Sequence, residues 1–236
     1  MTNWISIAQK EYGITLDSIA VERFGLYYRE LIEWNERFNL TAIRDQAGIE
    51  IKHFLDSLTV VSVTQRVPTN MIDVGTGAGF PGLALKIVWP DAKLTLVESV
   101  QKKANFCRHV AETLGFSDVT VLAQRVEEVG QDPLHRERYQ LVIARAVAAM
   151  PVLLEYLLPL AKPGGLVVMQ KGENGAQEAE AAQKIMHKLG GDLKEVRPVS
   201  LPDVDGNRFL IVVAKNAHTP KDYPRHAGTP AKTPLT

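Results

Sequence analysis

Cysteine is almost absent from this sequence, which contains a single one, Cys107, in 236 residues. An internal disulfide is therefore impossible, and such sparse cysteine usage is typical of proteins that work in the reducing cytoplasm. Long apolar runs are also missing, since no stretch approaches the roughly 18 to 20 residues that a helix needs to cross a bilayer. The first residues, MTNWISIAQKEYG, lack the basic segment and apolar core of an export signal. We therefore expect a cytoplasmic protein with no membrane segment.

An excess of charge of either sign is likewise absent, because 27 Lys and Arg residues balance 27 Asp and Glu residues. Zero net charge argues against a protein that coats nucleic acid generally. It leaves room for a local basic patch. The segment AKNAHTPKDYPRHAGTPAKTPLT has Asp222 as its one acidic residue and carries four basic ones, Lys215, Lys221, Arg225 and Lys232. The histidines are scattered without metal-ligand spacing, so we expect no metal site.

Two kinds of hydrophobic spacing divide the chain. The early segment LDSIAVERFGLYYRELIEWNERFNL has the spacing of an amphipathic helix, and its expected buried stripe is Ile19, Phe24, Tyr27 or Tyr28, Leu31 and Phe38. From about residue 70, short apolar runs alternate with longer amphipathic segments, as in β-α-β units with a mostly parallel sheet. We predict an N-terminal helical cap at 1–66, an α/β core at 67–216 and a basic, Pro-rich, irregular tail at 217–236.

The α/β core is predicted to be a Rossmann-like, doubly wound sheet. Its expected strands are 70–74, 93–98, 118–123, 139–144, 165–170 and 208–215. Helices are expected at 147–160, at 174–189 and after the second strand, where one apolar stripe contains Val100, Ala104, Cys107, Ala111 and Leu114. In such a sheet, ligands bind outside the carboxyl ends of the strands. Candidate functional residues are therefore those that follow each strand.

The first predicted strand runs into the glycine-rich stretch MIDVGTGAGFPG. Asp73 belongs to the strand, and the loop after it contains Gly75, Gly77 and Gly79. Glycines adopt positive φ angles and let a backbone approach a ligand closely. Pro81 suits the first turn of the following helix, whose free amides favour a negative group. A phosphate or the carboxylate of an amino-acid-like cofactor would satisfy those amides, so the loop predicts a nucleoside cofactor without choosing between them.

Further candidates follow the other strands. They are Glu98, Ser99 and Val100 after the second strand, Val126 and Glu127 after the third, Arg145 after the fourth and Lys171 after the fifth. Glu98 lies about twenty residues beyond the loop, where an acidic side chain accepts hydrogen bonds from ribose hydroxyls. Each of three residues also has a structural alternative to a role in ligand binding. Glu98 could form an ion pair with Lys102, Glu127 could be a solvated surface residue, and Arg145 could form a structural salt bridge.

Two spacings favour S-adenosylmethionine over a nicotinamide dinucleotide. The crowded G-T-G-A-G directly after DV resembles the first motif of class I methyltransferases. The segment LLPLAKPGGLVVMQKG resembles their late helix, Pro-Gly-Gly turn and fifth strand. We therefore expect a class I S-adenosylmethionine-dependent methyltransferase. A nicotinamide-dependent oxidoreductase and a non-catalytic RNA-binding protein on the same fold are the alternatives.

Blocks along nearly the whole chain resemble one family. In order, ERFNLTAIRD, HFLDSL, DVGTGAGFPGLALKI, LVESVQKKANFC, RVEEV, IARAVA, LPLAKPGG and YPRHAGTPAKTPL are similar to the ribosomal RNA small subunit methyltransferase G family, formerly glucose-inhibited division protein B. RAVAAM is a looser version of one block. The resemblance implies methylation of N7 of a guanine in the 530 loop of 16S rRNA, guanine 527 in standard rRNA numbering. The implied partner is 16S ribosomal RNA or the small ribosomal subunit, and we expect a monomer.

The resemblance also assigns parts of the cofactor to residues already singled out. These are Gly75 and Phe80 for the methionine and adenosine side, Glu98, Ser99 and Val100 for the ribose, and Val126 and Glu127 for the adenine. Arg145 would close the site near the reactive end. Because a guanidinium does not lose its proton near neutrality, Arg145 is expected to position a ligand rather than to act as an acid.

Guanine N7 has an in-plane lone pair and no proton to lose, so direct in-line transfer needs alignment of the reactants and no general base. His53 and Asp56 would share a helix face, and a pair that packs the cap onto the core is preferred to a catalytic pair. Basic side chains are expected to contact RNA phosphates. The candidates are Lys102, Lys103, Lys171, Arg225 and Lys232.

Overall fold

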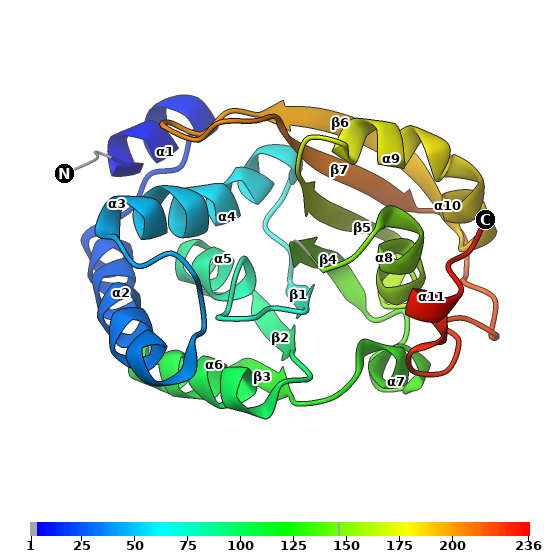
Figure 1. The fold of residues 1–236 in the computed structure, drawn as a ribbon, viewed down its shortest axis with the longest axis horizontal. Coiled ribbons are helices and arrows are strands. Elements are labelled where there is room, and N and C mark those ends of the chain that lie inside the picture. Colours follow the sequence, from blue (N-terminus) through cyan, green and yellow to red (C-terminus); the bar gives the residue numbers. More distant parts are fainter. Residues whose placement is uncertain (1–3, 146) are drawn as a thin grey trace.

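The computed structural model describes residues 4–145 and 147–236 as a seven-stranded sheet with helices on both faces (Figure 1). The strands are β1 (Asn70–Val74), β2 (Lys93–Val97), β3 (Val119–Leu122), β4 (Tyr139–Arg145), β5 (Ala161–Lys171), β6 (Gly191–Val199) and β7 (Arg208–Lys215). The helices before β1 are α1 (Trp4–Tyr12), α2 (Ser18–Phe38), α3 (Gln46–Ile49), the π-helical η1 (Glu50–Leu55), α4 (Asp56–Leu58) and the 3-10 helix η2 (Thr59–Val63). The later helices are α5 (Gly82–Val88), α6 (Gln101–Thr113), α7 (Val126–Gln131), α8 (Met150–Leu157), α9 (Gly175–Ala181), α10 (Gln183–Lys188) and α11 (Thr229–Lys232). Within these described ranges, no helix is both long and apolar enough to span a membrane.

The strand order across the sheet is β3-β2-β1-β4-β5-β7-β6. Strands β1 to β5 pair in parallel, whereas β7 runs antiparallel to both of its neighbours. The order reverses between β1 and β4, and ligands bind at the carboxyl ends of strands near such a switch point. This topology confirms the prediction of a mostly parallel, doubly wound sheet preceded by helices.

All six predicted strands are present, and β1 and β7 have the predicted bounds. The prediction missed β6, which pairs with β7 at one edge of the sheet. An edge strand buries only part of its surface, and much of β6 is half-exposed or exposed. Charged residues therefore interrupt its apolar pattern at Asp192, Lys194, Glu195 and Arg197.

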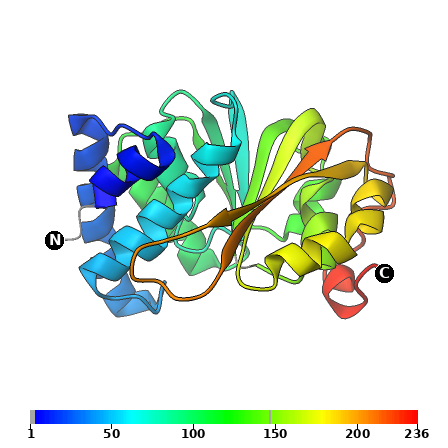
Figure 2. The same cartoon turned by 90° about the horizontal axis from the view of Figure 1, so that it is seen from above.

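Alternating side chains divide the interior into two cores, one on each face of the sheet. On β1, Met71 packs with the N-terminal helices, α5 and α6, whereas Ile72 packs with α8 to α10. β4 repeats this alternation, with Leu141 in the first core and Val142 in the second. Figure 2 shows the N-terminal helices on one side of the sheet and the yellow helices α9 and α10 on the other. Each face therefore buries a separate set of helices.

Helix α2 packs the cap onto the sheet largely along the predicted stripe. Phe24, Tyr27 and Leu31 are buried as expected. The prediction was wrong for Ile19, which is 57% exposed, because Ala20 occupies the buried face one position later. The helix begins after Asp17, whose Oδ1 accepts a hydrogen bond from the backbone N of Ala20 at 2.7 Å.

A substitution at Gly79, between β1 and α5, tests how tightly the glycine loop packs against the cap. Its φ is +91°, and an added Cβ would lie 2.5 Å from both Leu83 Cδ1 and Tyr27 Oη. Gly115 has a φ of +74° and no atom within 4 Å of such a Cβ, so it is a matched control. Both alanine variants are expected to lose about 1 kcal/mol to backbone strain, and Gly79→Ala about 2 kcal/mol more to overpacking. Urea unfolding measures the difference, and equal losses would contradict the predicted clash.

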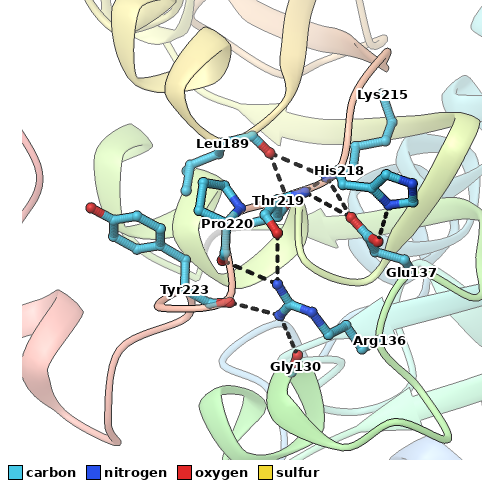
Figure 3. Close-up of polar contacts among 9 residues, drawn as sticks. All are labelled: Gly130, Arg136, Glu137, Leu189, Lys215, His218, Thr219, Pro220 and Tyr223. Carbon is cyan, nitrogen blue, oxygen red and sulfur yellow. Dashed lines mark hydrogen bonds and ion pairs between the residues drawn. The ribbon is translucent and has the colours of Figure 1, made fainter.

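The tail after β7 is held on the core by Arg136, in the loop before β4 (Figure 3). Its guanidinium donates four hydrogen bonds of 2.7 to 3.1 Å to backbone carbonyl oxygens, those of Gly130, Thr219, Pro220 and Tyr223. The prediction that the tail is wholly irregular was wrong, because α11 adds a helical turn beyond this attachment. The tail is therefore positioned by hydrogen bonds from Arg136, a residue more than 80 positions earlier in the sequence.

Glu137 holds the same segment from the adjacent position (Figure 3). Its carboxylate accepts from the backbone N of Thr219 at 2.8 Å and lies 2.6 Å from His218 Nδ1. Burial favours the neutral acid, but these hydrogen bonds and the charge of Lys215 hold the pKa of Glu137 below its ordinary value. Burial in turn lowers the pKa of Lys215 to about 8. Lys215 is fully buried, so its assignment to a basic patch open to a polyanion was wrong.

Candidate functional site

A cavity at the carboxyl ends of β1, β2 and β3 collects five of the predicted site residues. This first cavity has a volume of about 240 Å³. It is lined by Val74, Gly75, Val97, Glu98, Ser99, Gln124, Arg125, Val126, Glu127, Val147, Ala148, Val152, Tyr156 and Ala231. Residues from separate parts of the sequence meet here because parallel strands end at the same edge of the sheet. The cavity therefore lies where the sequence analysis expected a ligand.

Glu98 follows β2 and is only 6% exposed. Its Oε2 accepts from the backbone N of Gly77 at 3.0 Å, and its Oε1 accepts from the backbone N of Val100 at 2.8 Å. Each carboxylate oxygen can accept a further hydrogen bond, which suits the two neighbouring hydroxyls of a ribose. In the described part of the chain, the alternative ion pair with Lys102 is not formed. Val100 is 42% exposed and precedes α6, so the prediction that it joins the apolar stripe was wrong.

Asp73 lies buried beneath the glycine loop. Its Oδ2 accepts from Thr76 Oγ1 at 2.6 Å and from the backbone N of Gly82 at 2.8 Å. The first amide of α5, which the sequence analysis assigned to a ligand, is thus bonded to Asp73 instead. Burial raises the pKa of Asp73 to about 6, although the two hydrogen bonds oppose this shift. Among the residues that the structure describes, Oδ1 has no hydrogen-bond partner.

The raised pKa of Asp73 predicts a pH dependence of stability. The carboxyl binds its proton more tightly in the folded chain than in the unfolded chain, where its pKa is about 3.8. Its contribution to the free energy of unfolding is therefore greatest below pH 4, falls as the pH rises to about 6 and then levels off. Asp73→Asn is expected to lack this fall. Urea unfolding of both proteins from pH 4 to pH 7 measures it, and parallel pH profiles would contradict the assignment.

Glu127 lies at the start of α7 and is 2% exposed, so the alternative of a solvated surface residue was wrong. Its Oε1 accepts from the backbone N of Gly228 at 2.8 Å and from the Tyr156 hydroxyl at 3.3 Å. Burial favours the neutral acid, but the bond from Gly228 and the nearby Arg125 hold the pKa of Glu127 below its ordinary value. Its Oε2 is buried without a partner in the described residues. This free acceptor suits the exocyclic amino group of an adenine.

The C-terminal tail forms part of the first cavity. Ala231, in α11, lines its wall. Arg225 anchors the segment, because its Nε and Nη2 donate to Glu155 at 2.8 and 2.6 Å, and Glu155 is fully buried in α8. On another part of the wall, Gly75 packs closely against Val147, since an added Cβ at Gly75 would lie 2.7 Å from Val147 Cγ2. The cavity is therefore lined by segments from both halves of the chain.

Arg145, at the end of β4, lies in a second cavity of about 480 Å³. This second cavity is lined by Ile43, Lys52, His53, Asp56, Thr59, Arg145, Gln170, Lys171, Gly172, Val199, Arg208, Phe209 and Leu210. Arg145 Nη1 donates to Asp56 Oδ2 at 2.8 Å, and Nη2 lies 3.2 Å from His53 Nδ1. The structural salt bridge considered for Arg145 is therefore present. His53 and Asp56 both attach the cap to the sheet through this arginine.

The aromatic ring of Phe80 lies next to the Arg145 guanidinium. The ring stacks with those of Tyr27 and His53, with centroid distances of 4.9 and 4.6 Å, and the Arg145 guanidinium carbon lies 5.4 Å from its centroid. Phe80 is buried among these side chains and does not line the first cavity. Burial, together with the charge of Arg145, lowers the pKa of His53 to about 3. His53 is therefore neutral near pH 7.

The basic residues expected to contact RNA differ in their availability. Lys102 and Lys232 are exposed, and Lys103 is half-buried. Lys171 Nζ donates to the carbonyl oxygen of Ala148 at 3.1 Å and pairs with Glu178 at 2.9 Å. The guanidinium of Arg225 is bonded to Glu155, as described above. Two of the five candidates therefore already have partners within the protein.

The sequence analysis missed Gln170 and Arg208, which line the second cavity. Gln170 is the register partner of Arg145 on β5 and is a polar residue at the end of an apolar strand. The signal that singled out Arg145 could therefore have found it. Arg208 begins β7, and only the antiparallel placement of β7 beside β5 brings it to the same edge. No spacing along the chain indicates that contact.

The strand order, the glycine loop after β1 and the acidic residues after β2 and β3 together define a class I S-adenosylmethionine-dependent methyltransferase. The fold is similar to that of a SAM dependent methyltransferase from Aquifex aeolicus, with 18% identity, a TM-score of 0.55 and coverage of 74% of this chain and 96% of that chain. It is also similar to a 16S rRNA (adenine(1408)-N(1))-methyltransferase from Catenulisporales acidiphilia, with 15% identity, a TM-score of 0.53 and coverage of 64% and 86%.

Sequence comparison identifies the family. The sequence model of the family described as rRNA small subunit methyltransferase G matches residues 20–204 of this chain. Ribosomal RNA small subunit methyltransferase G from Roseiflexus sp. (strain RS-1) is 48% identical over 226 residues, which cover 96% of each chain. This chain belongs to the rRNA small subunit methyltransferase G family and is an enzyme that uses S-adenosylmethionine. The alternatives of a nicotinamide-dependent oxidoreductase and a non-catalytic RNA-binding protein are therefore excluded.

Proposed function

We propose that this enzyme transfers a methyl group from S-adenosylmethionine to N7 of guanine 527 in the 530 loop of 16S rRNA. The observation that carries the proposal is the presence of two cavities at one sheet edge, the first with acceptors for a nucleoside and the second rich in cations. The cations are Lys52, Arg145, Lys171 and Arg208. The name of the Roseiflexus relative supports a small-subunit rRNA substrate. The choice of N7 and of this guanine follows the motif resemblance.

In this proposal the first cavity holds the cofactor. Glu98 accepts from the ribose hydroxyls, and Glu127 Oε2 accepts from the adenine amino group. The remaining contacts are proposed for Gly75, Ser99, Val100 and Val126, with Asp73, Gly77, Gly79, Phe80 and Arg145 shaping the loop and the reactive end. When bound, S-adenosylmethionine supplies a methyl group on a positively charged sulfur.

The residues around the second cavity align the acceptor rather than move a proton. Guanine N7 attacks with a lone pair, so the enzyme gains most from holding the two reactants close and in line. Arg145 is fixed by Asp56 at 2.8 Å, and its planar guanidinium presents several donors in a rigid fork. It therefore suits a phosphate or a base edge. Neutral His53 braces Arg145, and no general base is required.

Contacts with the RNA backbone are proposed for the exposed or half-buried lysines Lys102, Lys103 and Lys232. Each phosphate contact releases counterions and makes affinity dependent on salt. Lys171 and Arg225 are already paired with carboxylates, so we propose that they act mainly by holding the surrounding structure. This division separates residues that attract RNA from residues that shape its binding surface.

We also propose that the enzyme acts as a monomer in the cytoplasm. Among the described residues, the exposed large apolar side chains are two in α2, Ile19 and Val21, and three in separate segments, Val67, Val100 and Leu134. Stable interfaces need contiguous apolar patches. A ribosomal substrate and a single buried cysteine support a reducing, ribosome-containing compartment.

Methylation of defined ribosomal particles tests the proposed function. The enzyme is incubated with labelled S-adenosylmethionine and with undermodified 30S subunits, 70S ribosomes or free 16S rRNA, and the digested RNA is analysed for N7-methylguanosine. The expected result is label in N7-methylguanosine from the 530 loop of at least one substrate. Absence of this nucleoside from every digest would contradict the proposal.

A further inference from the structure

Two residues that line the second cavity each have a buried polar atom that the protein leaves without a partner. The two atoms are Gln170 Oε1, an acceptor, and Arg208 Nε, a donor, and neither has a hydrogen-bond partner among the described residues. Gln170 is 7% exposed and therefore more than nine-tenths buried. An unpaired buried polar atom costs stability, so native proteins retain such atoms mainly where something else satisfies them. The pair therefore points to a ligand with a donor and an acceptor.

Hydrogen bonds fix the orientation of the Gln170 amide. Its Nε2 donates to the backbone carbonyl oxygen of Asp56 at 2.7 Å and lies 3.4 Å from Thr59 Oγ1. The flipped amide would place two carbonyl oxygens against each other, so the network assigns the free end as Oε1. Gln170 is thus held by the cap, and its acceptor is the part left over.

Arg208 supplies the complementary donor from the neighbouring strand β7. Its Nη1 lies 3.9 Å from Asp56 Oδ1, while Arg145 Nη1 binds Asp56 Oδ2 at 2.8 Å. Asp56 therefore binds the Arg145 guanidinium directly and lies within ion-pair distance of the Arg208 guanidinium. A buried acceptor flanked by fixed donors matches the Watson–Crick edge of guanine, which has a 2-amino donor, an N1–H donor and an O6 acceptor. Adenine presents its donor and acceptor in the opposite order.

The second cavity also adjoins the first, where the cofactor is proposed to lie. Arg145 lines the second cavity, whereas Val147 and Ala148, a few residues later, line the first. Lys171 belongs to the second cavity and donates to the carbonyl oxygen of Ala148. The two cavities therefore meet near the carboxyl end of β4. A base in the second cavity would lie next to the methyl donor.

We propose that the second cavity binds the target guanine turned out of the RNA loop, with Gln170 Oε1 accepting from its 2-amino group and Arg208 Nε donating to O6. This inference rests on the proposed function and adds the residues that select the base. Reading the Watson–Crick edge leaves N7, on the other side of the ring, free to react. Enzymes that modify a base extrude it from its stack in this way.

Methylation kinetics with an altered target base test the role of Gln170. Undermodified 30S subunits are reconstituted with guanine or with inosine, which lacks the 2-amino group, at the target position. The wild-type enzyme is expected to favour guanine about 10-fold or more in kcat/KM. Gln170→Met is expected to lower kcat/KM for guanine about 10- to 100-fold and to bring the guanine-to-inosine ratio close to one. A purely structural role would lower both rates and leave the ratio unchanged.

Arg208→Met provides a second variant at a side chain that is 34% exposed and so less critical for folding. It is expected to lower kcat/KM for 30S subunits about 10-fold without changing the Kd for S-adenosylmethionine. Lys194→Met is the control on β6, because Lys194 is an exposed cation that does not line the second cavity. Its rate should match that of the wild type.

The outcomes separate this inference from the proposed function. If the wild-type enzyme methylates no ribosomal substrate, the proposed function is wrong. If the wild type is active while Gln170→Met keeps its preference for guanine, or while Arg208→Met keeps the wild-type rate, the base-selection inference is wrong and the proposed function stands.

Discussion

Glu98→Ala is expected to raise the Kd for S-adenosylmethionine by at least about 10- to 100-fold, since even one lost hydrogen bond to a charged group is worth about 1.5 to 3 kcal/mol. The substitution removes the proposed ribose acceptors. It also leaves the backbone N–H groups of Gly77 and Val100 without the carboxylate that binds them now. Calorimetric titration measures the Kd, and the loss should appear before any RNA is added.

Glu128→Ala is the matched control for this experiment. Glu128 is a glutamate in α7, but it is exposed and does not line the first cavity. Its alanine variant is expected to bind S-adenosylmethionine as the wild type does. An unchanged Kd in Glu98→Ala would show that the ribose lies elsewhere and would contradict the placement of the cofactor.

Arg225→Ala is expected to destabilise the protein by about 3 to 5 kcal/mol, because it leaves a buried charge without its partner. Glu155 is fully buried and accepts three bonds from Arg225, from the backbone N at 2.9 Å and from the side chain at 2.8 and 2.6 Å. The alanine variant keeps only the backbone bond. Urea unfolding measures the loss.

Two further variants identify the cause of that loss. Lys232→Ala removes an exposed charge from the same tail and is expected to leave stability unchanged within about 0.5 kcal/mol. In Arg225→Ala with Glu155→Met, no buried charge remains, so much of the stability should return. If Arg225→Ala were no less stable than Lys232→Ala, the ion pair would not hold the tail. RNA-binding assays on the tail are therefore best made with Lys232→Ala.

The parts of the fold that were predictable are those in which local pattern and tertiary burial agree. β1 and β7 are apolar segments paired with neighbours on both sides, so their residues read as strands in isolation. β6 pairs on one side only and alternates charged with apolar residues, which weakens the local signal. Ile19 shows the same limit in a helix, because the position of the buried stripe depends on how α2 lies against α5 and α6.

The candidate site was predictable where it depends on parallel strands. Gly75, Glu98 and Glu127 were placed together because the ends of successive parallel strands share an edge. Gln170, near the end of the parallel strand β5, could have been found in the same way. The place of Arg208 depends on an antiparallel strand beside β5, and that of Arg225 on a buried glutamate 70 residues earlier. Such contacts are set by tertiary packing between distant segments, and local spacing carries no record of them.

In the proposed cofactor site, the carboxylate of Glu127 would couple the affinity for the cofactor to the docking of the C-terminal tail. One oxygen receives the backbone N–H of Gly228, while the other is buried and free beside the cavity that Ala231 helps to line. By thermodynamic linkage, if the docked tail strengthens binding at the free oxygen, the bound ligand strengthens the docking of the tail by the same free energy. In the proposed site, residues 225–236 would thus influence the affinity for the cofactor, although they lie far from the glycine loop in the sequence.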